Sequence, residues 1–216
     1  MLSTAEKTAM FRRLHAREGA FVIPNPWDIG SAKVLANLGF EALATTSAGY
    51  CNSIGRQDGQ LTLEEQIEHC KQLATSVNVP VNADLEHCYA DDPQTAAQNL
   101  CEAARTGIAG GSIEDYGGSS LYSFDHAVER VQAAVEAVRR LDFDFVVTAR
   151  AENLIRGVTD LDDTIRRLQA FEAVGADVLY APGLKTVEEI RTVADAVGKP
   201  LNILMPPVRG ATLADV

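Results

Sequence analysis

The sequence has few cysteines and no spacing that would pair them or place them around a metal. Its four cysteines form no CxxC pair and no metal-finger pattern. A chain of 216 residues can bury a sizeable core without disulfide bonds. We therefore expect Cys51, Cys70, Cys88 and Cys101 to be reduced, structural thiols.

Positive charge is also scarce. The chain has 19 Lys and Arg against 30 Asp and Glu, which gives a formal net charge of −11 at pH 7, and it contains no basic run. Because a phosphate backbone is bound by clustered Lys and Arg, the composition excludes nucleic acid as a partner. Any anionic ligand must find a local positive charge.

Long apolar runs and linker segments are missing. No stretch approaches the roughly 20 residues that span a bilayer, and the first twenty residues lack the apolar core of a signal peptide. We expect a cytoplasmic protein with no membrane partner. Since no Pro/Ser/Gly-rich segment interrupts the chain, we also expect residues 1–216 to form a single domain.

Short β-branched or apolar runs recur seven times and predict buried parallel strands. They lie at 21–23, 42–45, 79–81, 111–113, 145–148, 178–180 and 201–204.

Helical patterns lie between these runs. Valines at 128, 131, 135 and 138 form a stripe on a segment that Asp125 opens, and a second stripe lies at 190, 193 and 197. Capping boxes, Thr62 with Glu65 and Thr186 with Glu189, predict two helix starts. Strand-helix alternation predicts an α/β protein with a parallel sheet, either open or closed into a barrel.

The turn after the first run favours the barrel. An open sheet usually binds a nucleotide at a glycine-rich turn there, and residues 25–30 offer no such cradle. We therefore predict a (β/α)8 TIM-type barrel. No eighth strand and helix are evident after Pro206-Pro207, so either the eighth unit is missing or the N-terminal segment fills its place.

Polar residues follow four of the seven predicted strands, which is where parallel barrels carry their catalytic groups. They comprise residues 46–50, 82–87, 114–115 and 150–153.

Three of these residues predict a metal site. Asp84 and Glu86 are two positions apart, so an extended strand end directs both carboxylates to one side, and Glu114 on the next strand can join them. Such carboxylates repel one another unless a cation lies among them, and Mg²⁺ suits a few carboxylates with several waters. The alternative is that Asp84 and Glu86 cap a helix or pair with Arg and Lys.

Arg150 is the fixed cation at a strand end. Its guanidinium can bind a carboxylate through two parallel hydrogen bonds, or it can form a salt bridge to Glu152 or Glu114. Residues 47–49 offer a hydroxyl and two backbone N–H groups to an anion, although an ordinary turn explains the same residues.

Several segments along the chain form an ordered series. They are Asn25-Pro26-Trp27-Asp28 with Ser31-Ala32, Thr46-Ser47-Ala48-Gly49, Asp58-Gly59, Asn82-Ala83-Asp84-Leu85-Glu86, Gly110-Gly111-Ser112-Ile113-Glu114-Asp115 and Thr148-Ala149-Arg150. This series resembles the isocitrate lyase/phosphoenolpyruvate mutase superfamily over nearly the whole chain.

The resemblance implies a (β/α)8 barrel and a set of site residues. Mg²⁺, with Mn²⁺ as the alternative, would be bound by Asp58, Asp84, Glu86 and Glu114. A pyruvate-like 2-oxo acid would be held by Ser47, Ala48, Gly49 and Arg150, and we add Trp27 as a further substrate contact. Glu152, Tyr180 and Asn202, at the ends of later strands, are candidates for substrate contacts or proton delivery, although ordinary hydrogen bonding at the barrel rim explains them equally well. Arg150, Ser47 and Glu114 would be the catalytic residues.

Two departures from the family narrow the activity. The isocitrate and methylisocitrate lyases carry a Lys-x-Cys-Gly-His loop, and residues 116–125 contain no lysine, cysteine or histidine. The mutases carry an Asp-x-Asp where this chain has Asp84-Leu85-Glu86. We therefore expect a Mg²⁺-dependent lyase or hydrolase that cleaves a C–C or C–P bond of an oxaloacetate-like or phosphonopyruvate-like acid through a metal-stabilised enolate.

Other functions stay open at this point. Phosphoenolpyruvate mutase or methylisocitrate lyase-type activity is one alternative, and a non-catalytic barrel that binds a 2-oxo acid is another. An unrelated phosphate-binding barrel would need glycine-rich turns near the positions of Pro206 and Pro207. Because family members exchange a C-terminal helix between subunits, the resemblance also implies a homodimer or homotetramer.

Overall fold

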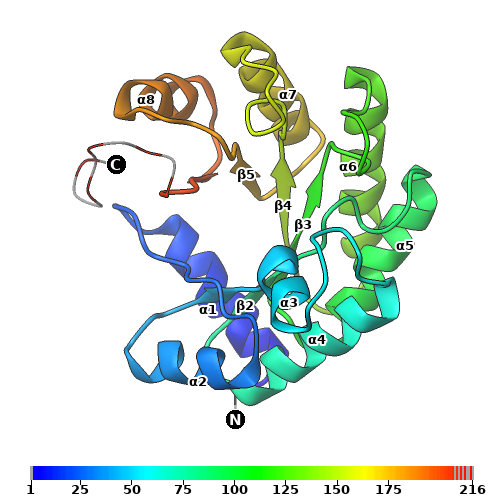
Figure 1. Ribbon diagram of the computed structural model, residues 1–216, viewed down its shortest axis with the longest axis vertical. Coiled ribbons are helices and arrows are strands. Elements are labelled where there is room, and N and C mark those ends of the chain that lie inside the picture. Colours follow the sequence, from blue (N-terminus) through cyan, green and yellow to red (C-terminus); the bar gives the residue numbers. More distant parts are fainter. Residues whose placement is uncertain (1, 207, 209, 211, 213–214, 216) are drawn as a thin grey trace.

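The computed structural model describes residues 2–206, 208, 210, 212 and 215. Its centre is a sheet of six parallel strands in sequential order. The strands are β1 (Leu43–Ala44), β2 (Val81–Asp84), β3 (Gly110–Glu114), β4 (Val146–Arg150), β5 (Val178–Tyr180) and β6 (Leu201–Asn202). The sheet curls into part of a barrel, and most helices lie around its outside (Figure 1). The α/β class and the parallel sheet are therefore confirmed.

Helices alternate with the strands along the chain. They are α1 (Thr4–Ala16), α2 (Ile29–Asn37), α3 (Ser47–Ser53), α4 (Leu63–Ser76), α5 (Pro93–Ala104), α6 (Phe124–Val138), α7 (Leu161–Ala173) and α8 (Val187–Ala196). None of the described helices is both long and apolar enough to cross a bilayer.

Local signals set several helix starts. The Thr62 and Thr186 side chains accept hydrogen bonds from the backbone N–H groups three residues later, so both capping boxes are confirmed. The valine stripe on α6 is largely buried, and it turns one face of that helix toward the sheet. All four cysteines are free and buried, as the sequence predicts.

The core is closed at the N-terminal end of the strands. There, Phe11 and Leu14 of α1 pack against apolar residues at or just before the strand starts, namely Ala42, Ala109, Val146 and Val178. A larger cluster fills the space between sheet and helices. Because α1 fills this end, the polar side chains at the opposite end, where the strands finish, are left to line a cavity.

The prediction of a strand at 21–23 is wrong. This segment is extended, but its link to β1 is a hydrogen bond from the Ala44 N–H to the Pro24 carbonyl (3.0 Å). Pro24 and Pro26 have no N–H to donate, so a regular ladder cannot form. The strand predicted at 79–81 begins only at Val81. Six strands, not seven, are present in the described residues, and Pro207 lies outside them.

Candidate active site

A cavity of about 400 Å³ lies at the carboxyl ends of the strands. Strand register explains which residues meet there. Glu114 pairs with Arg150, Arg150 with Tyr180, and Tyr180 with Asn202, so the last residues of four neighbouring strands form one row. In-register neighbours of a parallel sheet point their side chains the same way, and all four line the cavity.

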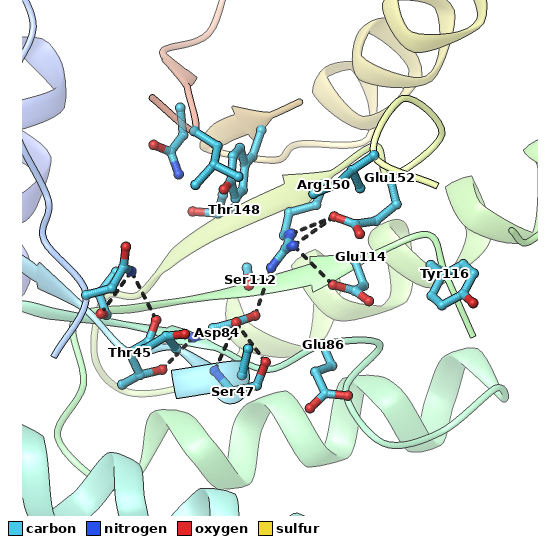
Figure 2. Close-up of a pocket in the computed structure, with 18 of the residues that line it drawn as sticks. Thr45, Ser47, Asp84, Glu86, Ser112, Glu114, Tyr116, Thr148, Arg150 and Glu152 are labelled. Atoms are coloured by element: carbon cyan, nitrogen blue, oxygen red, sulfur yellow. Dashed lines mark hydrogen bonds and ion pairs between the residues drawn. The ribbon is translucent and has the colours of Figure 1, made fainter. Parts of the chain in front are cut away.

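Arg150 is the central cation of the site (Figure 2). Its guanidinium donates to Asp84 Oδ1 (2.8 Å) and Glu152 Oε1 (2.8 Å), and it forms an ion pair with Glu114 Oε2 (3.4 Å). The ring of Tyr180 lies beneath the guanidinium, 4.9 Å away. Burial lowers the pKa of Arg150, but the three carboxylates outweigh it and raise the pKa. Arg150 therefore stays charged and joins β2, β3 and β4 at their ends.

The loop after β1 delivers a hydroxyl to the same carboxylates. Thr46 caps α3, so the chain turns sharply and places Ser47 beside β2. Ser47 donates to Asp84 Oδ2 from its N–H (3.2 Å) and its hydroxyl (3.0 Å), and its Oγ lies 3.3 Å from Asp58 Oδ1. Two acidic side chains and one serine are thereby gathered at one edge of the cavity.

Two glutamates of the site hold protons more tightly than usual. Burial, then the charges of Asp84 and Asp58, raise the pKa of Glu86 to about 7. Burial also raises the pKa of Glu114 well above its ordinary value, and the nearby carboxylates of Glu152 and Asp84 add to the shift while Arg150 opposes it. The cavity thus contains more negative charge than its arginines neutralise.

A second layer of polar residues fixes Glu152. Its N–H donates to Asp115 Oδ1 (2.8 Å), and Arg167 of α7 donates to the other oxygen of Asp115 (3.0 Å). Arg156, in the same loop, lies 3.1 Å from Glu152 Oε2 and stacks on the Tyr116 ring. Arg156 is a second cation at the cavity wall.

The donor chemistry fits a hard divalent cation. Asp58, Asp84, Glu86 and Glu114 all line the cavity, and the raised pKa of Glu86 arises partly from its neighbours' negative charge. No three His, Cys, Asp or Glu side chains of the described residues form a closed ligand cluster. Mg²⁺ does not need one, because it binds through one or two carboxylates and keeps several waters.

Most of the residues singled out from the sequence line this cavity. They are Ser47, Ala48, Asp58, Asp84, Glu86, Glu114, Arg150, Glu152, Tyr180 and Asn202. Trp27 and Gly49 are not among the lining residues: Trp27 is 47% exposed, and the Gly49 N–H is bonded to the Thr46 hydroxyl. The salt bridges that the sequence left as alternatives also form, because Arg150 pairs with Asp84, Glu114 and Glu152.

Sequence reasoning missed Arg156 and Tyr116. Both follow strand ends, so the rule that strand-end loops carry the site could have found them. Tyr116 follows Glu114 and Asp115 directly, whereas Arg156 has no charged neighbour in the sequence, and only the fold shows that the two stack.

Comparisons with known proteins place this chain in a family of enzymes. The family described as phosphoenolpyruvate phosphomutase matches residues 11–216. The chain is 32% identical to an oxaloacetate decarboxylase of Paraburkholderia xenovorans (strain LB400), over 96% of this chain and 71% of that protein.

Solved structures share the fold. A proposed lyase/mutase from Burkholderia cenocepacia J2315 is 48% identical over 98% of this chain and 78% of its own, with a TM-score of 0.95. A phosphonopyruvate hydrolase, crystallised with oxalate and Mg²⁺, has a TM-score of 0.88 at 23% identity, over 99% of this chain and 76% of its own. At that identity the likeness shows the fold alone.

Proposed function

Because the chain belongs to the isocitrate lyase/phosphoenolpyruvate mutase superfamily of enzymes, we propose that it uses a divalent metal to cleave a C–C or C–P bond of a small 2-oxo acid. The observation that carries this proposal is the placement of Arg150 among the carboxylates of Asp84, Glu114 and Glu152, in a cavity that Ser47 also lines. Such a cavity can hold a cation and an anion side by side.

The side chains divide into two groups in this proposal. Asp58, Asp84, Glu86 and Glu114 would hold Mg²⁺, with Mn²⁺ as the alternative. The bound cation would supply the positive charge that stabilises an enolate oxyanion as the substrate bond breaks.

Arg150 and Ser47 would bind the carboxylate of the substrate. Arg150 can do so by exchanging one of its three acidic partners for the substrate, since its planar guanidinium presents several N–H groups. Tyr180, whose ring lies beneath the Arg150 guanidinium, and Asn202, the neighbour of Tyr180 in the strand-end row, would complete the contact surface. Glu114 faces the same cavity, and its catalytic role would be exerted through the cation that it helps to hold.

A substrate with two anionic groups suits the cavity better than one with a single group. Arg156 is the second cation at the wall, and part of its side chain is accessible (37% exposed). Oxaloacetate-like and phosphonopyruvate-like acids both carry a second anionic group, and relatives named for such substrates share this chain's sequence or fold.

We also propose that the partial barrel belongs to a (β/α)8 architecture, formed by one domain over residues 1–216. The extended segment at 21–24 supports this proposal. It lies beside β1, bonded to it through Pro24 and Ala44, and Phe21 and Ile23 pack on the closed end of the core. In a (β/α)8 barrel this segment would take the place of the first strand.

Thermal unfolding with oxalate, a planar mimic of the pyruvate enolate, tests the function. A ligand at about 100 times its dissociation constant adds roughly 2.7 kcal/mol to the native state. We expect a rise in the melting temperature that requires oxalate and Mg²⁺ together, and pyruvate release from oxaloacetate or phosphonopyruvate. A joint shift without turnover would favour the non-catalytic binding barrel, and no shift would contradict the site itself.

A further inference from the structure

The turn that follows β2 has an unusual backbone. Three of its residues, Glu86, Cys88 and Tyr89, have φ values of 50°, 56° and 57°, although none is glycine. The left-handed region is unfavourable for residues with a Cβ, and non-glycine residues persist there only where their surroundings hold them. The first of the three is a proposed metal ligand, so whatever holds this turn also sets the direction of the Glu86 side chain.

A buried arginine from another element holds the turn. Arg130 of α6 is 1% exposed, and its guanidinium donates to three backbone carbonyls of the turn. The bonds run from Nη1 to Ala90 O (2.5 Å) and Asp91 O (2.6 Å), and from Nη2 to His87 O (2.5 Å). All three acceptors are peptide carbonyl oxygens, and none is a carboxylate. The guanidinium therefore supplies hydrogen-bond donors to backbone carbonyl groups that have no regular helix or strand partner in this irregular turn.

Neighbouring groups fix Arg130 and the far end of the turn. The guanidinium lies 4.4 Å from the centre of the Tyr122 ring, and the Tyr122 hydroxyl donates to the Asp91 carboxylate. His126, one turn before Arg130 on α6, places Nε2 3.0 Å from Asp91 O. The start of α6 and the turn after β2 thus form one hydrogen-bonded unit.

The near end of the turn is tied to the site. The Glu86 carbonyl accepts from the N–H of Glu114 (3.0 Å), and the Tyr89 hydroxyl lies 3.5 Å from Glu86 Oε1. Glu86 therefore stands between a fixed strand end and a segment that depends on Arg130. In Figure 2 the Glu86 side chain extends from the turn just after β2, and its carboxylate lies on the side of Ser47.

We propose that Arg130 is a positioning residue, which clamps residues 86–91 so that the Glu86 carboxylate faces the cavity. This inference rests on the proposed metal site. Arg130 does not line the cavity, so it would act on metal binding only through the turn. Asn99 of α5 also bonds the turn, at Cys88 O (2.9 Å), which should allow the protein to fold without Arg130.

The test compares Arg130→Met with a matched control at the other end of the molecule. Lys7 is likewise a buried cation (3% exposed) that donates to backbone carbonyls, of Ala74 (2.6 Å) and Val77 (2.8 Å). We expect both Arg130→Met and Lys7→Met to lower the melting temperature. Only Arg130→Met should weaken Mn²⁺ binding, measured by electron paramagnetic resonance, by tenfold or more, and Arg130→Lys should recover part of the loss.

Two further measurements separate the clamp from general destabilisation. In a Glu86→Gln background, Arg130→Met should cause little additional loss of Mn²⁺ affinity, because both changes act on one ligand. In the metal-free protein, the rate of amide hydrogen exchange at residues 88–91 should rise at least tenfold in Arg130→Met and should not change in Lys7→Met.

The outcomes are distinguishable. Unchanged exchange in the turn, or wild-type Mn²⁺ affinity in Arg130→Met, would overturn the clamp. If the losses of Mn²⁺ affinity caused by Arg130→Met and Glu86→Gln were fully additive in the double variant, Arg130 would not act on the metal through Glu86. Failure of the wild-type protein to bind Mn²⁺ would overturn the proposed metal site, and with it the positioning role, whatever the exchange data show.

Discussion

At the scale of single residues, Asp84 connects Ser47, in the loop after β1, with Arg150 at the end of β4. Its carboxylate accepts from Ser47 through one oxygen and from Arg150 through the other. It is therefore within reach of both the proposed metal and the residue proposed to bind the substrate. Its removal should affect chemistry more than folding, because Arg150 keeps Glu114 and Glu152 as partners.

We predict that Asp84→Ala lowers metal-dependent turnover by about 100-fold or more, since a ligand and an orienting acceptor are lost together. The loss in free energy of unfolding should stay below the roughly 3–5 kcal/mol seen when a buried charge is left unpaired. Steady-state turnover and urea denaturation measure the two effects. Asp144→Ala, which removes a partner of Arg12 far from the cavity, is the control and should keep full turnover.

Glu86 gives the site a pH dependence. Its pKa rises from 4.5 to about 7 on folding, because of burial and then the charges of Asp84 and Asp58. The folded state thus retains a proton that the unfolded state releases. This contribution to stability is present below the unfolded pKa and is lost as pH rises through about 7.

We therefore predict that the melting temperature of the metal-free protein falls more steeply between pH 5 and pH 8 in the wild type than in Glu86→Gln. Mg²⁺ should stabilise the wild type more at pH 8 than at pH 5, since it binds the ionised carboxylate. Differential scanning fluorimetry across this range measures both effects. Parallel pH profiles for the two proteins would show that Glu86 does not titrate as described.

At the scale of elements, β3 and β4 form the most extensive strand pair and bring Glu114 beside Arg150. Close packing at the start of β3 allows this pairing. A Cβ on Gly110 would lie 2.7 Å from the Val146 carbonyl oxygen and 2.7 Å from Asn82 Oδ1. The first of these is backbone in β4, so it cannot move aside without disturbing the ladder.

We predict that Gly110→Ala destabilises the protein by about 1–3 kcal/mol, as overpacked cores do. The same change at Gly30, near the start of α2, meets nothing closer than 3.4 Å and has an ordinary φ, so Gly30→Ala should be neutral or slightly stabilising. Urea denaturation of both variants measures the difference. Equal stability of the two would contradict the tight β3–β4 approach.

At the scale of the whole molecule, the sheet has an open side. The outer edge of β6 has no strand partner among the described residues. A mostly apolar cavity of about 550 Å³ is lined by side chains from residues 200–206 and 19–25. These two segments lie at the open side of the sheet in Figure 1. Unpaired edges and apolar walls favour association with other chains.

We therefore keep the prediction of a homodimer or homotetramer. Light scattering coupled to size exclusion should give a multiple of the 23.2 kDa chain mass at micromolar concentration. A mass equal to one chain over the whole concentration range would contradict it.

The sequence by itself determined the local features and the chemical inventory of the site. Capping boxes at Thr62 and Thr186 fixed helix starts, because a cap depends on residues three positions apart. Short apolar runs that alternate with helical segments predicted the parallel sheet. Polar residues after these runs predicted where Asp84, Glu114 and Arg150 would meet. These signals are local, so they need no knowledge of the fold.

Only the tertiary structure decided which residues are partners. Register places Glu114, Arg150 and Tyr180 in one row, and burial with mutual repulsion raises the pKa of Glu86. The contact of Arg130 with a turn some forty positions earlier leaves no pattern in the sequence. Hydrogen bonds and charges act through space, so distances along the chain do not reveal them until the strands and helices are packed.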